Sequence, residues 1–377
     1  MPSDLHDPLE RLPASELERL LAAGLDRARF KEHVARVRSE TPEDNFVRGT
    51  ITAPAEGDVE ELPPQGSAEY RALEQRGQEA LSKGQAALIV LAGGMATRMG
   101  GVIKALVEAL PGHTFLELRL NEARAHEKRY GVKPPLWIMT SEATNAGIQK
   151  ALEGKLDGDR VATFQQSISA RLTPEGDLFL GDDGKPSAHA PGHGDLPDAL
   201  KRSGLVQRFV EGGGKVVMMT NLDNLGGSLD PALIGWHLSH GAAVTAEVVD
   251  KVGSDRGGIP ARVDGKIQIL EEFRIPPSFD PATVRVFATN VFTFDAPTLA
   301  ALDMPWTFFR VTKKVDGRPA IQFERLVNEV SSTLPTRYLK VPRSGAGSRF
   351  LPVKDNDELA ARRAENELVA KTRGMLP

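Results

Sequence analysis

The sequence lacks cysteine, has no long apolar run and shows no excess of positive charge. Without cysteine the chain can form no disulfide, catalytic thiol or cysteine metal site, which fits a reducing cytoplasm. No run approaches the ~20 apolar residues that a membrane helix needs. The first ten residues, MPSDLHDPLE, lack the basic start and apolar core of a signal peptide. These absences predict a cytoplasmic protein with no membrane partner.

The charge balance excludes a further class of partner. The chain has 47 lysine and arginine residues against 51 aspartate and glutamate residues, so its formal net charge is 47 − 51 = −4. A nucleic-acid-binding protein usually shows a clear basic excess, and we therefore expect no nucleic-acid partner. The apolar share of 40% and the length of 377 residues are ordinary for a globular protein of about two domains.

What is present is an alternation of apolar strands and amphipathic helices from residue 86 onward, which predicts an α/β sheet covered on both faces. Before it we expect helices over 15–37, with Ser15 and Glu18 as a capping box, an acidic proline-rich connector over 39–65, and a helix over 68–82. The expected strands are 86–92, 136–140, 216–221, 244–249, 266–271, 284–294 and 308–315. The expected later helices are 115–130, 142–153, 196–211 and 231–240.

The segment 86–104, AALIVLAGGMATRMGGVIK, runs from the first apolar strand into a glycine-rich loop. Glycines let backbone N–H groups close on an anion at the end of a strand, and Arg98 and Lys104 add positive charge there. The P-loop and the dinucleotide fingerprint both fail, because the glycine spacing is wrong and no Gly-Lys pair follows. A phosphate loop and an ordinary glycine turn both remain open at this point.

Other polar residues follow later strands, where ligands of α/β sheets collect. His193 lies between glycines and can bind a substrate hydroxyl or phosphate, whereas Asp195 is better explained as the N-cap of the next helix. Asp223 suits either Mg²⁺ held against phosphates or an Asx-turn. Lys251 is a second phosphate candidate, although a lone lysine is usually a surface residue.

Nine segments in order make these signals specific: LAGG-x-x-TR, PP-x-x-IMTS, FQQ, PGHGDL, TNLDNLG, E-x-x-DK-x-x-x-D-x-GG, ILEEF, KKVDG-x-x-x-IQFE and RFLPVK. Over about residues 86–360 the chain resembles the UDP-sugar pyrophosphorylase family, most closely its eukaryotic UTP-glucose-1-phosphate uridylyltransferases. The glycine loop is similar to the family's L-x-G-G-x-G-T-R-x-G-x-x-x-P-K, except that Ala96 replaces a glycine and Ile103 the proline. Val291 also replaces an asparagine, so a sugar or phosphate contact is expected to be missing.

The resemblance implies a GT-A-like, Rossmann-related mixed sheet with helices on both faces, after a helical N-terminal segment. It divides the chain into an N-terminal segment and connector (1–85), a nucleotidyltransferase domain (86–340) and a C-terminal segment (341–377) with Lys354 and a final helix. Family members of this type continue into a β-helix domain, but only 377 − 354 = 23 residues follow Lys354 here. We therefore expect that domain to be absent; a monomer is favoured, with the oligomeric state left open.

The activity implied is the formation of a UDP-sugar and pyrophosphate from UTP and a sugar 1-phosphate with Mg²⁺. By position, the resemblance places Leu91, Gly93, Gly94, Gln166 and Gly192 at the nucleotide. It places Arg98, Lys104 and Lys354 at the reacting phosphates, and Asp223 at Mg²⁺. It places His193, Lys251, Glu271 and Asn290 at the sugar phosphate and the sugar hydroxyls.

The residue types fit this chemistry, since an anionic sugar phosphate needs no general base and catalysis must come from positioning and neutralising charge. Glucose 1-phosphate is the first candidate substrate; N-acetylglucosamine 1-phosphate, galactose 1-phosphate or a broad specificity are alternatives. A glycosyltransferase is a candidate from another class, although Asp223-Asn224 does not match its D-x-D motif. A third alternative, motivated by Ala96 and Ile103, is a regulator that binds UTP without turnover.

Overall fold

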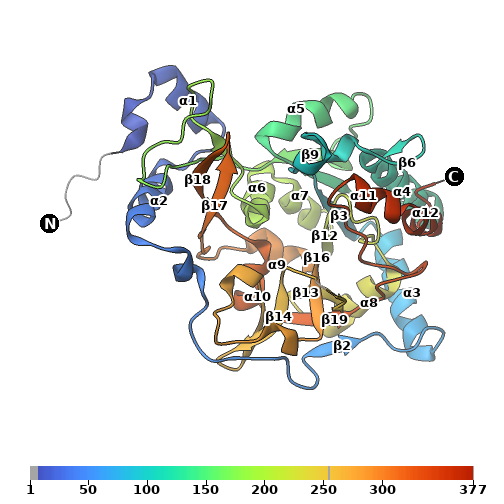
Figure 1. The fold of residues 1–377 in the computed structure, drawn as a ribbon. Helices are drawn as coiled ribbons and strands as arrows, with labels where there is room; N and C mark the ends of the chain where they lie inside the picture. Colours follow the sequence, from blue (N-terminus) through green and yellow to red (C-terminus); the bar gives the residue numbers. More distant parts are fainter. Residues whose placement is uncertain (1–6, 254, 377) are drawn as a thin grey trace.

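The computed structural model, which describes residues 7–253 and 255–376, is built around one eight-stranded mixed sheet (Figure 1). Seven of its strands run parallel, and β16 runs antiparallel to its two neighbours. In spatial order the strands are β2 (Val59–Glu61), β19 (Thr336–Lys340), β13 (Val244–Asp250), β16 (Val286–Asp295), β12 (Val216–Asn221), β3 (Ala86–Leu91), β8 (Leu136–Thr140) and β9 (Val161–Gln165). The predicted mixed α/β sheet is confirmed.

Both faces of the sheet are covered, because alternate residues of each strand enter different hydrophobic clusters. In β3, Leu88 and Val90 join one cluster, and Ala87 and Ile89 join the other. The first is completed by α3 (Ala68–Ser82), α4 (Phe115–Tyr130), α5 (Glu142–Ala151), α8 (Pro231–His240) and α12 (Arg363–Thr372). The second is completed by α6 (Leu196–Ser203), α7 (Leu205–Glu211), α9 (Ala296–Ala301) and α10 (Val330–Thr333).

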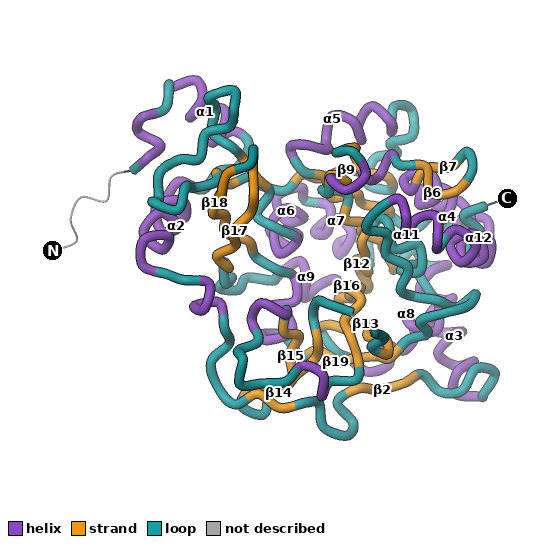
Figure 2. Tube along the Cα trace, in the orientation of Figure 1, coloured by secondary structure: helices purple, strands orange, loops and turns teal. Residues whose placement is uncertain are grey.

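A smaller lobe stands beside the main sheet, at the left of Figures 1 and 2. Its own apolar cluster joins α1 (Ala14–Ala22) and α2 (Arg27–Ser39) to the hairpin of β17 (Phe309–Val315) and β18 (Arg318–Glu324). The short strands β10 (Ser169–Ala170) and β11 (Ala188–His189) pair with each other there. The lobe therefore connects the first helices to chain segments far away in the sequence.

A separate three-stranded sheet consists of β1 (Ile51–Thr52), β14 (Ile259–Val263) and β15 (Lys266–Leu270).

Several expectations differ from the structure at the level of single elements. The predicted helix over 196–211 is two helices, because Gly204 adopts a left-handed φ of 71° between them. The capping box at Ser15 and Glu18 is wrong, since α1 begins at Ala14 after Pro13 and has no side-chain cap. The expected connector contains β2, which pairs with β19 at the sheet edge. The division of the chain at residues 85 and 340 stays a prediction.

Among the described residues no helix is both long and apolar enough to cross a membrane.

Candidate functional site

The candidate site lies where β3, β8 and β12 end side by side. Leu91, the last residue of β3, pairs with Asn221 of β12 on one side and with Met139 of β8 on the other. The loops that leave these strands carry the glycine-rich segment, Ser141 and Asp223. The sheet register therefore brings three predicted loops to one edge, as expected for ligand sites of α/β sheets.

The glycine-rich loop forms a small hairpin of β4 (Met95–Ala96) and β5 (Val102–Ile103). Its turn needs glycine, because Gly100 and Gly101 have φ values of 87° and 74°. Ile103 packs on α5, where a Cβ at Gly147 would lie 2.3 Å from Ile103 Cδ1. A side chain anchored on a helix thus fixes the hairpin at the position where the family pattern has proline.

Lys104, directly after this hairpin, reaches the loop that follows β12. Its Nζ donates to Oδ2 of Asp223 at 2.8 Å, and the backbone N–H of Val353 donates to the same oxygen at 2.9 Å. The two side chains keep 24% and 10% of their surface exposed. The carboxylate therefore contacts other segments as well as lying in a turn, and it brings Lys104 and the neighbour of Lys354 to one place.

Gly93 and Gln166 are also in contact. A Cβ at Gly93 would lie 2.5 Å from Gln166 Nε2, so any larger residue there would displace the Gln166 amide. The Ser141 hydroxyl donates to the Gly93 carbonyl at 2.9 Å, which fixes the start of the glycine loop. Gln166 is buried, and its Oε1 has no hydrogen-bond partner in the described part of the chain. This buried acceptor is free for a ligand donor such as an imide N–H.

His193 lies against the segment that follows β18. Its Nδ1 accepts a hydrogen bond from the Val327 N–H at 3.0 Å, and burial lowers the pKa of His193 to about 4. The ring is therefore neutral at pH 7 and keeps Nε2–H as a donor. The preceding Gly192 has φ 93°, and a Cβ there would lie 2.6 Å from the Arg325 carbonyl oxygen.

The predicted N-cap role of Asp195 is wrong. Its side chain caps no helix; it accepts from the Ser167 N–H at 2.7 Å and pairs with the buried guanidinium of Arg325. The residue instead ties the loop of His193 to the segments of Ser167 and Arg325.

Two residues predicted near the sugar come from different strands: Asn290 lies in β16, and Glu271 directly follows β15. Asn290 has an uncommon left-handed φ of 58°, and its Nδ2 donates to Asn221 Oδ1 at 3.0 Å. Glu271 lies after β15 and accepts from the Asn328 amide; burial raises the pKa of Glu271 to about 7. Val291, next to Asn290, faces the core and is 1% exposed, so this position belongs to the sheet packing.

The structure does not bring every predicted residue to the same contacts. Lys251 Nζ donates to the Pro281 carbonyl at 3.2 Å, so one of its N–H groups is already hydrogen-bonded to the protein backbone. Arg98 and Lys354 are exposed, one on the glycine hairpin and one after Val353. Gly94 is exposed at the start of the hairpin, with open space where a Cβ would be. Their predicted roles require a ligand to draw them together.

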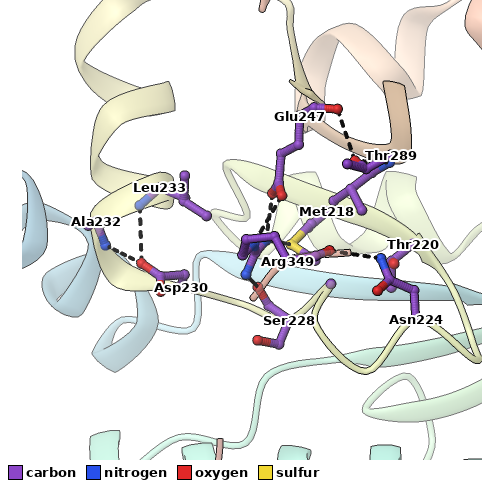
Figure 3. Close-up of polar contacts among 12 residues, drawn as sticks. Met218, Thr220, Asn224, Ser228, Asp230, Ala232, Leu233, Glu247, Thr289 and Arg349 are labelled. Carbon is purple, nitrogen blue, oxygen red and sulfur yellow. Dashed lines mark hydrogen bonds and ion pairs between the residues drawn. The ribbon is translucent and has the colours of Figure 1, made fainter. Parts of the chain in front are cut away.

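Sequence reasoning missed the charged residues that hold the loop after Asp223, which carries Asn224 and Ser228 (Figure 3). Arg349 is buried and pairs with Glu247 of β13 at 2.5 Å, while its Nη1 donates to the Ser228 carbonyl at 2.7 Å. Of the basic residues near the end of the chain only Lys354 was assigned to the phosphates, and the burial of Arg349 excludes it as a ligand contact. A glutamate inside the apolar run VTAEVVD was the available signal.

Two further contacts complete this support. The Asn224 amide donates to the Arg349 carbonyl at 3.0 Å and accepts from the Leu351 N–H at 2.8 Å (Figure 3 shows the first). On the other side, the buried Arg119 of α4 donates to the Gly227 carbonyl at 2.9 Å. Because both ends of the loop are clamped, the Asp223 carboxylate has a fixed direction.

A mixed sheet with a glycine hairpin after the inner parallel strand β3, and a lysine and a carboxylate at the same edge, agrees with the GT-A-like class of α/β folds. A sequence model of the UTP-glucose-1-phosphate uridylyltransferase family matches residues 30–372, and the chain belongs to this family.

Individual relatives agree with this assignment. The UTP-glucose-1-phosphate uridylyltransferase of Hordeum vulgare is 30% identical over 289 residues, which cover 72% of this chain and 60% of that protein. A probable UTP-glucose-1-phosphate uridylyltransferase of Schizosaccharomyces pombe is 29% identical, covering 80% of this chain and 63% of that protein. The chain thus spans less than two thirds of the length of these relatives.

Solved structures share the fold. A UDP-glucose phosphorylase from Trypanosoma brucei has a TM-score of 0.73 at 23% identity, over 93% of this chain and 78% of that one. The uridine diphosphate N-acetylglucosamine pyrophosphorylase of the same organism has a TM-score of 0.75 at 21% identity, over 97% and 82%. Both the glucose and the acetamido type therefore share this architecture, and the fold alone does not choose a sugar.

Proposed function

We propose that this protein is a uridylyltransferase that makes UDP-glucose and pyrophosphate from UTP and glucose 1-phosphate. The observation that carries the proposal is the Lys104–Asp223 contact of 2.8 Å at the strand ends, on the same sheet edge as the Gly93–Gln166 contact. These two contacts place a cation, and a carboxylate that can bind a metal ion, beside a loop whose backbone can approach phosphate. Membership of the uridylyltransferase family supports the same reaction.

In the proposed step, an oxygen of the sugar phosphate attacks the α-phosphorus of UTP. A new P–O bond forms, the bond to the bridging oxygen breaks, and pyrophosphate leaves with its electron pair. No proton has to move, so the protein's contribution is to align two polyanions and to neutralise charge. We assign neutralisation to Arg98, Lys104 and Lys354, and uracil recognition to Gln166, whose Oε1 lacks a partner among the described residues.

Asp223 is the residue that we assign to Mg²⁺. Hydrogen bonds from the described residues reach only its Oδ2, which leaves Oδ1 for a hard cation. No cluster of three candidate ligand side chains occurs in the described ranges, so phosphate oxygens and water would complete the coordination. When bound, Mg²⁺ supplies positive charge to the phosphates.

We assign Gly192 to the nucleotide, beside the uracil. The residues that we assign to the sugar 1-phosphate are His193, Lys251, Glu271 and Asn290. Nδ1 of His193 already accepts a hydrogen bond from the Val327 N–H, and burial lowers the pKa of His193 to about 4. The neutral ring therefore carries its proton on Nε2, which can donate to a ligand. A neutral donor binds phosphate without depending on pH near 7. Asn290 is suited to accept from a hydroxyl, since its buried Oδ1 has no partner among the described residues.

The test is pyrophosphate release by the purified protein with UTP and magnesium chloride, comparing glucose 1-phosphate, N-acetylglucosamine 1-phosphate and galactose 1-phosphate. We expect release with a clear preference for glucose 1-phosphate. Preference for another sugar phosphate would keep the reaction and correct the substrate. UTP binding without release would favour a regulator, and sugar transfer from UDP-glucose without pyrophosphate would favour a glycosyltransferase.

A further inference from the structure

Asn328 is a buried side chain that none of the roles above includes. It lies in the short 3₁₀ turn Val327–Glu329, is 3% exposed, and donates from Nδ2 to Oε1 of Glu271. The backbone carbonyl of Asn328 accepts a hydrogen bond from the Ser331 hydroxyl at 2.6 Å, which fixes the turn. The contact crosses from the segment after β18 to the end of β15, so Asn328 and Glu271 come from different parts of the fold.

The backbone of Gly258 closes this pair from a third side. A Cβ built at Gly258 would lie 3.0 Å from Glu271 Oε1 and 3.2 Å from Asn328 Nδ2. Such distances are tighter than ordinary contacts, so the carboxylate and the amide rest directly on the glycine. The Asn328 amide donates to Glu271 and the Gly258 backbone packs against it, and the two contacts together restrict the rotamer of Glu271.

The residue before Asn328 holds the other end of the proposed sugar-phosphate site. The Val327 N–H donates to His193 Nδ1 at 3.0 Å, and two steps earlier Arg325 exchanges backbone hydrogen bonds with Pro191 and Gly194 at 2.8 and 3.0 Å. One run of four residues, 325–328, thus contacts both the phosphate-side histidine and the hydroxyl-side glutamate. Their separation is set by this run.

We propose that Asn328 is a positioning residue for the sugar, which fixes Glu271 as a hydroxyl acceptor at a set distance from the phosphate donor His193. The ligand class that fits is a hexose 1-phosphate, because an oriented carboxylate accepts from sugar hydroxyls. The inference rests on the proposed function and concerns the residue that orients Glu271.

The charges around Glu271 give the inference a readout that packing alone would not change. Burial raises its pKa to about 7, while the Asn328 amide lowers it; Arg274 also lowers it, and Glu272 and Glu329 raise it. Loss of the amide therefore moves the Glu271 pKa further upward. Because a protonated carboxyl loses acceptor capacity, the variant should lose sugar binding at a higher pH than the wild type does.

The experiment compares the Asn328→Ala protein with the wild type and with Asn45→Ala. Asn45 is a matched control, since it is a buried amide that holds the Arg310 backbone at 2.8 and 3.1 Å. We expect Asn328→Ala to raise the KM for glucose 1-phosphate about tenfold, the scale of one hydrogen bond to a charged group. The KM for UTP should stay within about twofold.

The acid limb of kcat/KM should also move to higher pH in Asn328→Ala and stay in place in Asn45→Ala. Asn328→Asp, which keeps the shape but opposes two carboxylates, should move it further and serves if the alanine variant does not fold. If a folded, active Asn328→Ala protein kept the wild-type KM for glucose 1-phosphate and the wild-type acid limb of kcat/KM, the role of Asn328 would be overturned. The proposed function would not be affected by that result. A wild-type protein that releases no pyrophosphate with any sugar phosphate would overturn the proposed function and this inference with it.

Discussion

Two donors converge on one oxygen of Asp223, the ammonium of Lys104 and the N–H of Val353. If this pair acts at the phosphates, Lys104→Ala and Asp223→Asn should each lower kcat about 100-fold, the usual effect of one oriented electrostatic group. Initial rates of pyrophosphate release measure this. Lys150→Ala, an exposed lysine of α5, is the control and should keep its rate. A folded Lys104→Ala protein with full activity would remove the residue from the site.

The ion pair under the same loop allows a second prediction at this scale. Both side chains of Arg349 and Glu247 are 2% exposed, so Glu247→Gln would leave the guanidinium buried without its counter-charge. We expect a loss of about 3–5 kcal/mol in the free energy of unfolding, measured by urea denaturation. Glu367→Gln removes an exposed partner of Lys371 and should leave the denaturation curve in place. Equal curves for both variants would contradict the support role of Arg349.

The helices α3 and α8 pack against each other with their backbones in close approach. A Cβ at Gly77 would lie 1.8 Å from the Pro231 carbonyl oxygen, and one at Gly235 would lie 1.8 Å from the Leu73 carbonyl oxygen. In an open helix Gly→Ala stabilises by roughly 1 kcal/mol, but here the backbones must separate. Gly77→Ala and Gly235→Ala should therefore each destabilise, by about 1–3 kcal/mol or more in urea.

Gln75→Ala on the exposed face of α3 is the control for these helix variants, and we expect a change within about 0.5 kcal/mol. A Gly77→Ala protein as stable as the wild type would mean that the helices lie further apart than the structure has them.

Elements with a strong local signal could be predicted from the sequence, and elements defined by distant partners could not. α4 begins after a complete capping box at Thr114 and Glu117 and ends at Tyr130, before the cap residue Gly131, so its bounds match the prediction. β8 and β12 match too, because they are continuous apolar runs between turns. β2 is a three-residue strand with the sequence VEE, and only pairing with β19 makes it a strand.

The same distinction applies to the candidate site. Glycine spacing and the order of motifs indicated Gly93, Lys104, Asp223 and Gln166 before any contact was visible, because these motifs are local. The partners of Asp195 and the Arg349–Glu247 pair follow from strand order and burial, which no local pattern contains. Asn328 likewise acquires a role only when β15 and the turn after β18 lie together.

For the molecule as a whole, buried histidines predict the direction of its acid sensitivity. Burial lowers the pKa of His33 to about 3 and the pKa values of His189 and His237 to about 4. Below about pH 6.5 the unfolded chain binds protons that the folded chain does not, so stability falls as pH decreases from 6.5 toward 4. Each such group contributes up to ~1.4 kcal/mol per pH unit in that window.

His33→Phe tests this at one position, since the ring stacks on Phe323 at 4.3 Å and phenylalanine can keep that contact. The variant should lose less unfolding free energy than the wild type between pH 7 and pH 5, as measured by urea denaturation at both values. Parallel losses in the two proteins would show that His33 takes up no proton on unfolding.

The pairing of β2 with β19 has a consequence for how the chain is made. Glu60 and Arg337 form an ion pair across this sheet edge although they lie 277 positions apart in the sequence. A ribosome releases the first strand long before the second, so the edge stays open until residues 336–340 have been made. The clamp on the Asp223 loop waits even longer, for Arg349. We therefore expect the nascent chain to hold the elements of the candidate site early and to order that site only after Arg349 has been made.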